Sequence, residues 1–390
     1  MIEFTILMPC LNEAETLAIC IRKAKKYIAD NNLKAEVLIA DNGSTDRSVE
    51  IALAEDARVI PVSVKGYGAA LLAGIKESKG KYIIMGDADD SYDFYALNLF
   101  VDKLKEGFEL VMGNRFKGGI RPGAMPFMHQ YFGNPVLTFI GRLFFRNQIG
   151  DYNCGLRGFN KDKILSLHLV TPGMEFATEM VVKSTIRKLT ITEVPIILYP
   201  DGRKRPPHLQ TWRDGWRQLV FLLIYSPKWL FLFPSLFFLF LSFAGIFALL
   251  PGTLYFSNFA LDIHTLTIVG TTTALSYQLL LFTVLIRVFS INMGLYPAQK
   301  KHRRFTDYFT LERGIVIGLI MLISGLFMLI VLFYKWAQLY FGPIPDLGAS
   351  FRLLIPAVTL ISLGVQTIFS SFFLRILNLK PQNNTSNEMV

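Results

Sequence analysis

Acidic side chains follow three short apolar segments of this chain, each long enough for a buried strand. The segments are residues 4–8, 37–40 and 82–85. The acidic residues that follow them are Glu13, Asp41, Asp87 and Asp89. If the segments are parallel strands, their carboxyl ends meet at one edge of a sheet and bring these carboxylates together. Because like charges in one cleft repel, the pattern predicts a site for a divalent cation or a polar ligand.

The carboxylates of Asp87 and Asp89 alternate across a turn, so both can face the same cleft. Mg²⁺ and Mn²⁺ prefer hard oxygen ligands, usually one or two carboxylates together with water and substrate phosphates. We therefore expect Asp87 and Asp89 to hold Mg²⁺ or Mn²⁺. Asp41 is expected to bond a ribose or a base, whereas Asp46 is expected to cap the helix that follows it.

Strand-like and helix-like segments alternate around these residues. Residues 59–62 form a further strand-like run, and the helix-like segments are 13–29, 46–54 and 67–78. This order predicts an α/β domain with a mostly parallel sheet flanked by helices on both faces. Gly66 and Gly68 are expected only to let a loop turn tightly into the helix that follows.

The composition divides the chain into two unlike parts. Of 390 residues, 52% are hydrophobic and 18% charged, and the net charge is +10. Residues 1–228 carry 30 Lys and Arg and 25 Asp and Glu, whereas residues 229–390 carry only 10 and 5. The three cysteines have no paired spacing. These observations exclude a disordered chain, a disulfide scaffold and a purely soluble enzyme.

Four uncharged segments in the second part are long enough to cross a bilayer as helices. They are residues 229–250, 265–286, 315–334 and 353–374. Basic residues collect in 200–228 and 287–314, and the N-terminus lacks the pattern of a signal peptide, so we expect both termini in the cytosol. The predicted organisation is a cytosolic domain (1–228), an all-α transmembrane domain of four helices (229–375) and a cytosolic tail (376–390). Such a chain would be a multi-pass protein of the inner or plasma membrane.

Two further segments, 135–146 and 210–223, carry apolar stripes beside arginines. Helices of this kind can lie in the headgroup plane or pack as ordinary surface helices on a domain core. No helix-turn-helix, finger or RNA-binding motif accompanies the basic charge, so we expect no nucleic-acid partner and attribute the charge to an anionic membrane face.

The order of several short motifs resembles the family 2 glycosyltransferases, which have a GT-A (Rossmann-like) fold. More narrowly, it resembles the polyprenyl-phosphate glycosyltransferases, the group that includes dolichol-phosphate mannose synthase. The resemblance spans about residues 1–228. The matching motifs are PCLNE at 9–13, DNGSTD at 41–46, DADD at 87–90, GNRF at 113–116, DYNCGLRGF at 151–159 and EVP at 193–195.

The resemblance implies roles for individual residues. It places the nucleotide contacts on Pro9, Leu11, Glu13, Ile39 and Asp41. It places the contacts to the metal and the diphosphate on Asp87, Ala88 and Asp89. Two residues depart from the family pattern: Asn42 stands where a second Asp is usual, and Ser91 where many members have Gln.

The resemblance implies that Asp151 is the catalytic carboxylate. Asp89 and Arg115 are the other expected catalytic residues. An acceptor phosphate has a second pKa of about 6 and is already mostly a dianion near pH 7, which leaves little for a general base to do. We therefore expect Asp151 to orient the acceptor side of the cleft through Arg115 or Arg157.

The acceptor phosphate itself requires cationic partners. A planar guanidinium binds phosphate oxygens in bidentate fashion, which makes Arg115, Arg203 and Arg205 the candidates. For the cluster of Arg203, Lys204 and Arg205, binding to anionic lipid is an equal alternative.

The implied reaction is the inverting, metal-dependent transfer of a hexosyl group from a UDP- or GDP-hexose to undecaprenyl or dolichyl phosphate at the cytosolic membrane face. The implied partners are a nucleotide-sugar donor, a polyprenyl-phosphate lipid and the membrane. A homo-oligomer formed through the transmembrane domain is left open. The alternatives are a processive polysaccharide synthase, whose Q-x-x-R-W motif is not matched here, and a non-catalytic membrane subunit that retains the fold.

Overall fold

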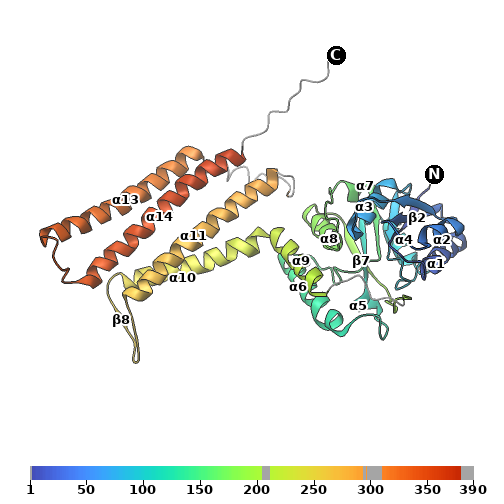
Figure 1. The fold of residues 1–390 in the computed structure, drawn as a ribbon, viewed down its shortest axis with the longest axis horizontal. Helices are drawn as coiled ribbons and strands as arrows, with labels where there is room; N and C mark the ends of the chain where they lie inside the picture. The colour runs from blue at the N-terminus through green and yellow to red at the C-terminus, as the bar shows by residue number, and fades with distance from the viewer. Residues whose placement is uncertain (1, 204–210, 293–295, 297–309, 379–390) are drawn as a thin grey trace, which may run out of the picture. The chain divides into compact units, whose positions relative to one another are not determined.

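The computed structural model describes residues 2–203, 211–292, 296 and 310–378 of the chain. These residues form two compact units, Met1–Ser226 and Pro227–Val390. The first unit is an α/β domain and the second is a bundle of long helices (Figure 1).

A seven-stranded sheet forms the centre of the first unit. The strands are β1 (Phe4–Cys10), β2 (Ala35–Asp41), β3 (Arg58–Pro61), β4 (Tyr82–Met85), β5 (Leu110–Asn114), β6 (Arg157–Asn160) and β7 (Ile191–Pro195). Their order is β3-β2-β1-β4-β6-β5-β7. All neighbours are parallel except β6, which runs antiparallel to β4 and β5. The predicted mostly parallel α/β sheet of the GT-A type is confirmed.

Helices cover both faces of this sheet because side chains alternate along its strands. Phe4, Ile6 and Met8 of β1 lie in one buried cluster with α1 (Leu17–Asp30) and α4 (Asn98–Lys105). Leu7 points to the opposite face, where it contacts Gly74 of α3 (Tyr67–Glu77) so closely that a Cβ at position 74 would lie 2.3 Å from a Leu7 methyl.

The remaining helices of the first unit follow the strands in chain order. They are α2 (Ser48–Ala54), α5 (Arg115–Gly118), a π-helical turn (His129–Gly133) that leads into α6 (Asn134–Phe145), α7 (Lys161–Leu165), α8 (Phe176–Ile186) and α9 (Thr211–Ile224). The two segments with apolar stripes are helices α6 and α9. Both expose large apolar side chains, among them Phe139 of α6 and Trp216 of α9.

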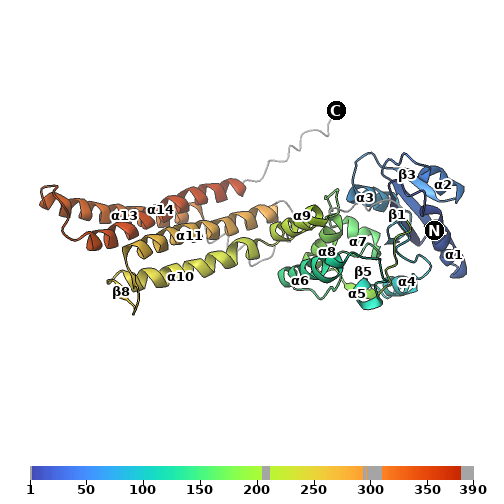
Figure 2. The ribbon, with the colours of Figure 1, turned by 60° about the horizontal axis from the view of Figure 1, so that its bottom comes forward.

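Within its described residues, the second unit contains four helices that are long and apolar enough to cross a membrane, as predicted. They are α10 (Phe233–Leu249, preceded by the π-helical turn Lys228–Leu232), α11 (Ile263–Asn292), α13 (Leu311–Gln338) and α14 (Leu347–Leu377). Between α10 and α11 lies a short hairpin, β8 (Leu254–Tyr255) and β9 (Ala260–Leu261). The helices run side by side (Figure 2).

Helices α13 and α14 pack closely because glycines face each other at their contact. A Cβ added at Gly318 would lie 2.8 Å from the carbonyl oxygen of Gly364, and a Cβ at Gly364 would lie 2.6 Å from the carbonyl oxygen of Gly318. Small residues at a helix contact let two backbones approach within membranes, where burial of apolar surface does not drive association.

Candidate active site

Asp41 ends β2, and its carboxylate turns back onto the loop that follows. It accepts hydrogen bonds from the backbone N–H groups of Gly43 at 3.1 Å and Ser44 at 3.2 Å. The side chain is thereby fixed at the carboxyl end of the strand. A carboxylate has about four lone-pair sites, so this arrangement retains capacity for further donors such as the hydroxyl groups of a ribose.

Asn42 links the end of β2 to the loop after β3. Its Nδ2 donates to the carbonyl oxygens of Val62 at 3.3 Å and Val64 at 2.7 Å, and its Oδ1 accepts from the backbone N–H of Gly66 at 2.7 Å. An ionised Asp has no proton to donate to the two carbonyls. The departure from the family pattern at this position therefore has a structural reason.

Asp46 accepts hydrogen bonds from two backbone N–H groups. One belongs to Ser48 in the first turn of α2, at 2.9 Å, and the other to Ala14, at 3.1 Å. The residue thus contacts the start of α2, as expected, and also ties it to the loop after β1.

Tyr67 was not singled out from the sequence, yet it is a direct partner of Asp87. Its hydroxyl donates to Oδ1 of Asp87 at 2.8 Å. The flanking glycines place it there: a Cβ at Gly66 or Gly68 would lie 2.2 or 2.3 Å from a carbonyl oxygen of the segment 171–172. The glycine pair thus lies where residues 171–172 closely approach the start of α3.

Asp87 and Asp89 follow β4, and the charge of Asp89 acts on Asp87. Burial of Asp87, together with the negative charge of Asp89, raises the pKa of Asp87 to about 6. The hydrogen bond from Tyr67 acts in the opposite direction. Asp89 is supported by Ser91, whose hydroxyl donates to Oδ1 at 2.5 Å. Ser91, the second departure from the family pattern, thus holds one of the two expected metal ligands.

Arg203 lies between the carboxylates of this edge. Its Nη2 is 2.8 Å from Oδ2 of Asp89 and 2.9 Å from Oδ2 of Asp201, and its Nη1 is 3.2 Å from Oε1 of Glu13. The structure therefore places Arg203 among the carboxylates expected to bind the donor, and its contact with the acceptor phosphate stays a prediction. Arg205 and Lys204 lie outside the described residues.

The residues present fit a divalent cation bound jointly by protein and substrate. Within the described ranges, no three His, Cys, Asp or Glu side chains cluster in a way that would enclose a metal. Mg²⁺ in phosphoryl sites commonly takes one or two carboxylates, and the phosphates of the substrate supply further ligands. Asp87 and Asp89 provide such a pair, and a bound cation would counter both causes of the raised pKa of Asp87, its burial and the negative charge of Asp89.

Arg115 and Asp151 form a buried bidentate ion pair. Nε and Nη2 of Arg115 each lie 2.7 Å from a carboxylate oxygen of Asp151. The backbone N–H groups of Arg115 and Asn153 donate to the same carboxylate, each at 3.2 Å. The side chain of Asp151 is fully buried and that of Arg115 is 9% exposed. Geometry therefore favours a carboxylate that orients Arg115 over one that collects a proton.

Arg157, the alternative partner of Asp151, donates hydrogen bonds to three backbone carbonyls. It donates to Tyr152 at 2.8 Å, Cys154 at 2.8 Å and Ala177 at 2.5 Å. These bonds shape the loop that continues from Asp151 towards the acidic edge. At that end a Cβ on Gly155 would lie 2.5 Å from Oδ2 of Asp87.

The other expected nucleotide contacts occupy two environments. Pro9 and Leu11 are half-buried at the end of β1. The side chains of Ile39 and Ala88 are 1% and 3% exposed and belong to the buried cluster of the sheet. The predicted nucleotide contacts at these two positions stay predictions.

Two family models match the chain. One, described as glycosyl transferase family 2, matches residues 5–166. The other, described as the glycosyltransferase family 2 C-terminal transmembrane region, matches residues 284–378. Together they cover strands β1 to β6 with the acidic edge, and helices α13 and α14 of the second unit, whereas β7 lies outside both matches.

Individual proteins resemble the chain over different lengths. A low-salt glycan biosynthesis hexosyltransferase, Agl6, of Haloferax volcanii is 35% identical over 377 residues, which is 95% of this chain and 88% of the relative. A dolichyl-phosphate hexose transferase of the same organism is 27% identical over 50% of this chain and 82% of its own length. A crystal structure of glucosyl-3-phosphoglycerate synthase from Mycobacterium tuberculosis with Mn²⁺, UDP and glucosyl-3-phosphoglycerate is 21% identical, with a TM-score of 0.47, over 57% of this chain and 79% of that chain.

Proposed function

This chain belongs to glycosyltransferase family 2, and from that premise we propose that it transfers a hexosyl group from a nucleotide sugar to a polyprenyl phosphate at the cytosolic face of a membrane. The observation that carries the proposal is the joining, in one chain, of an acidic strand edge to four apolar helices long enough to cross a bilayer. The relative named a hexosyltransferase covers both parts. The relative named for dolichyl phosphate supports the lipid acceptor.

On the donor side, Asp41 binds the nucleoside, while Glu13 and Arg203 lie beside the diphosphate. Asp87 and Asp89 would hold Mg²⁺ or Mn²⁺, which when bound supplies positive charge to the leaving diphosphate. Tyr67 and Ser91 keep the two carboxylates in place through the hydrogen bonds described above. The donor is a UDP- or GDP-hexose.

On the acceptor side, a phosphate oxygen attacks the anomeric carbon as the bond to the nucleoside diphosphate breaks, which inverts the configuration at that carbon. Arg115 contacts the acceptor phosphate with its Nη1, because Nε and Nη2 are taken by Asp151. The phosphate dianion needs no proton removed, so Asp151 acts by holding Arg115. Arg205 stays a candidate for the same phosphate.

The orientation of the spans completes the proposal. Basic residues lie before the first span and in the loop after the second, whereas residues 251–264 contain no Lys or Arg. By the positive-inside rule the first unit and both termini face the cytosol, where nucleotide sugars are found.

Labelled UDP- and GDP-hexoses test the function directly. Membranes that contain the full-length chain are incubated with each donor and with undecaprenyl or dolichyl phosphate. We expect label in an organic-extractable lipid that mild acid releases, and much less of it with the Asp89→Asn variant. Label that enters only a polymer, or no transfer from any donor by a protein that binds nucleotide, would contradict the proposal.

A further inference from the structure

Glu193 of β7 is tied to the loop that carries Asp151. Its Oε1 accepts hydrogen bonds from the backbone N–H of Gly150 at 2.6 Å and from that of Asp151 at 3.2 Å. Its Oε2 is 2.9 Å from Nζ of Lys117. The carboxylate is 7% exposed, whereas the Lys117 side chain is 60% exposed. Oε1 of Glu193 therefore fixes the position of the backbone at the start of this loop.

The loop fits tightly against its support. A Cβ at Gly150 would lie 2.6 Å from Nδ2 of Asn114, and both Glu193 oxygens would be within 3.6 Å of it. Asn114 in turn caps α5, because its Oδ1 accepts from the backbone N–H of Lys117 at 2.9 Å. The start of α5, the end of β5 and the loop thus meet at one place, and Arg115 is the first residue of that helix.

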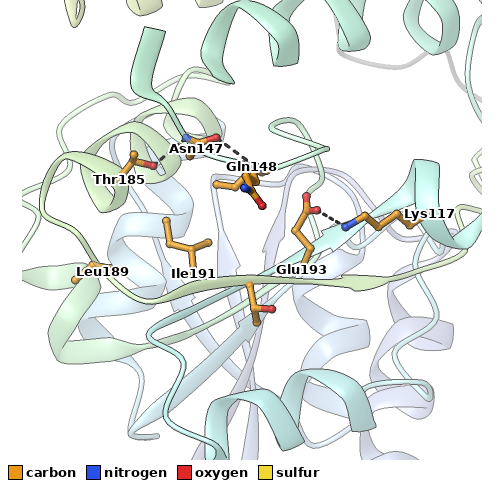
Figure 3. A pocket seen from close by; sticks show the side chains of 9 residues that line it. Lys117, Asn147, Gln148, Thr185, Leu189, Ile191 and Glu193 are labelled. Atoms are coloured by element: carbon orange, nitrogen blue, oxygen red, sulfur yellow. Dashed lines mark hydrogen bonds and ion pairs between the residues drawn. The ribbon is translucent and has the colours of Figure 1, made fainter. Parts of the chain in front are cut away.

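A cavity of about 390 Å³ lies on the outer side of the loop (Figure 3). Its lining residues include Lys117, Asn147, Gln148, Thr185 and Glu193. Glu193 and Lys117 pair along one side of it, and Asn147 bonds Thr185 at 3.0 Å on the other. The cavity thus borders the loop beside Glu193, and the bonds to Glu193 hold the loop backbone at this place.

We propose that Glu193 is a positioning residue for transfer to the acceptor: by fixing the backbone of Gly150 and Asp151, it sets the place of the Arg115–Asp151 ion pair. This inference rests on the proposed function, in which Arg115 contacts the acceptor phosphate. The chain of contacts runs from Glu193 to the loop backbone, from Asp151 to Arg115, and from Arg115 to the phosphate. Neither Glu193 nor Lys117 touches a substrate.

Three substitutions distinguish the hydrogen bonds that Glu193 accepts from the effect of its negative charge. Glu193→Ala removes the acceptor of both N–H groups. Glu193→Gln retains a carbonyl oxygen in the position of Oε1 and removes only the charge. Lys117→Met removes only the ion pair, which at its exposed end contributes little.

Glu36 offers a matched control at the opposite end of the sheet. It lies near the start of β2, pairs with Arg58 at 2.9 Å and accepts from the backbone N–H of Lys79 at 2.7 Å. Glu36→Ala therefore removes the same kinds of contact, an ion pair and a backbone hydrogen bond, away from the strand ends where the site lies.

The experiment measures kcat and KM for polyprenyl phosphate, nucleotide Kd and the thermal unfolding midpoint of the full-length protein. For Glu193→Ala we expect kcat/KM for the acceptor to fall by about 10²-fold, the loss typical of a reacting group displaced by ~1 Å, while nucleotide Kd stays near the wild-type value. Glu193→Gln and Lys117→Met should retain most activity, and Glu36→Ala should lower only the unfolding midpoint.

Gly150→Ala displaces the same loop while residue 193 stays Glu, and it serves if Glu193→Ala does not fold. We expect the same loss confined to the acceptor. Acceptor kinetics of Glu193→Ala or Gly150→Ala that match those of Glu36→Ala would overturn the inference, as would a Gln variant as defective as the Ala variant. A wild-type protein that labels no polyprenyl phosphate would instead refute the proposed function.

Discussion

Replacing Asp151 with Asn separates a positioning carboxylate from a general base. In the structure the carboxylate accepts three bonds from Arg115, counting its backbone N–H, and one from Asn153. Asn keeps the shape of the side chain but has only one acceptor oxygen, and its amide nitrogen would place a donor against the guanidinium. The substitution therefore breaks one arm of the bidentate pair and leaves the Arg115 charge without a counter-ion.

The size of the effect follows from burial. Removing one partner of a buried ion pair costs about 3–5 kcal/mol, because the remaining charge stays uncompensated in a low-dielectric site. Asp151 is fully buried and Arg115 is 9% exposed, so we expect a loss in this range rather than the ~0–1 kcal/mol of a surface pair. Arg115→Met combined with Asp151→Leu should recover much of the stability, since apolar pairs of similar volume replace buried ion pairs at little cost.

The assay combines unfolding with a pH–rate profile. Unfolding of the wild type, Asp151→Asn and the double variant gives the three free energies. Initial rates from pH 6 to pH 8, with saturating donor, give the profile. We expect Asp151→Asn to lose activity by the same factor at each pH and to keep the shape of the wild-type profile. A true base would show a loss of about 10²–10⁴-fold and an altered profile.

One result would refute the positioning role. This result is an Asp151→Asn variant that has wild-type stability, is inactive and lacks the basic limb of the pH–rate profile. The ion pair would then contribute little to the structure, and proton removal would be needed for the reaction. The double variant adds one comparison: recovered stability without recovered activity shows that the activity depends on the ion pair itself and not on the stability it contributes.

The remaining predictions concern the donor edge. Asp89→Asn should keep the fold and membrane insertion but lose most activity, since one anionic metal ligand disappears; near-normal turnover, or full wild-type activity in excess chelator, would contradict this. Arg203→Gln should bind Mn²⁺ more tightly without donor, because a positive charge leaves the carboxylates of Glu13 and Asp89; weaker binding in a Mn²⁺ titration would show that Arg203 does not compete with the cation. Asn42→Asp should lower the free energy of unfolding by about 1–3 kcal/mol, the cost of buried acceptors left without donors. Asn42→Ser, which keeps a donor, is its comparison, and equal denaturation midpoints for Asn42→Asp and the wild type would count against the link between the two loops.

Much of the fold could be predicted because its signals are local. The strands of the acidic edge are continuous apolar runs that end in polar turns, and the membrane helices are long uncharged segments, so periodicity and composition suffice. The antiparallel strand β6 gave no such signal. It is only four residues long, and its place between β4 and β5 depends on pairing across the sheet.

The site is less predictable because its contacts are distant in the chain. Arg203 pairs with Asp89, 114 residues away in the sequence, and with Glu13, 190 residues away. Residue spacing does not predict contacts at such separations. Arg115 and Asp151 are separated by 36 residues, and only the family motifs indicated that they belong to the same site.

The glycine contact between α13 and α14 has a consequence for biogenesis. Helices of this hydropathy insert into a bilayer one by one, and their association is a later and separate step. Gly318 and Gly364 matter only for the later step, because each prevents a clash with the backbone of the other helix. A larger residue at either position would therefore yield a protein whose helices insert with normal topology but do not pack together. Cellular quality control would then recognise an unpacked helix pair within the membrane.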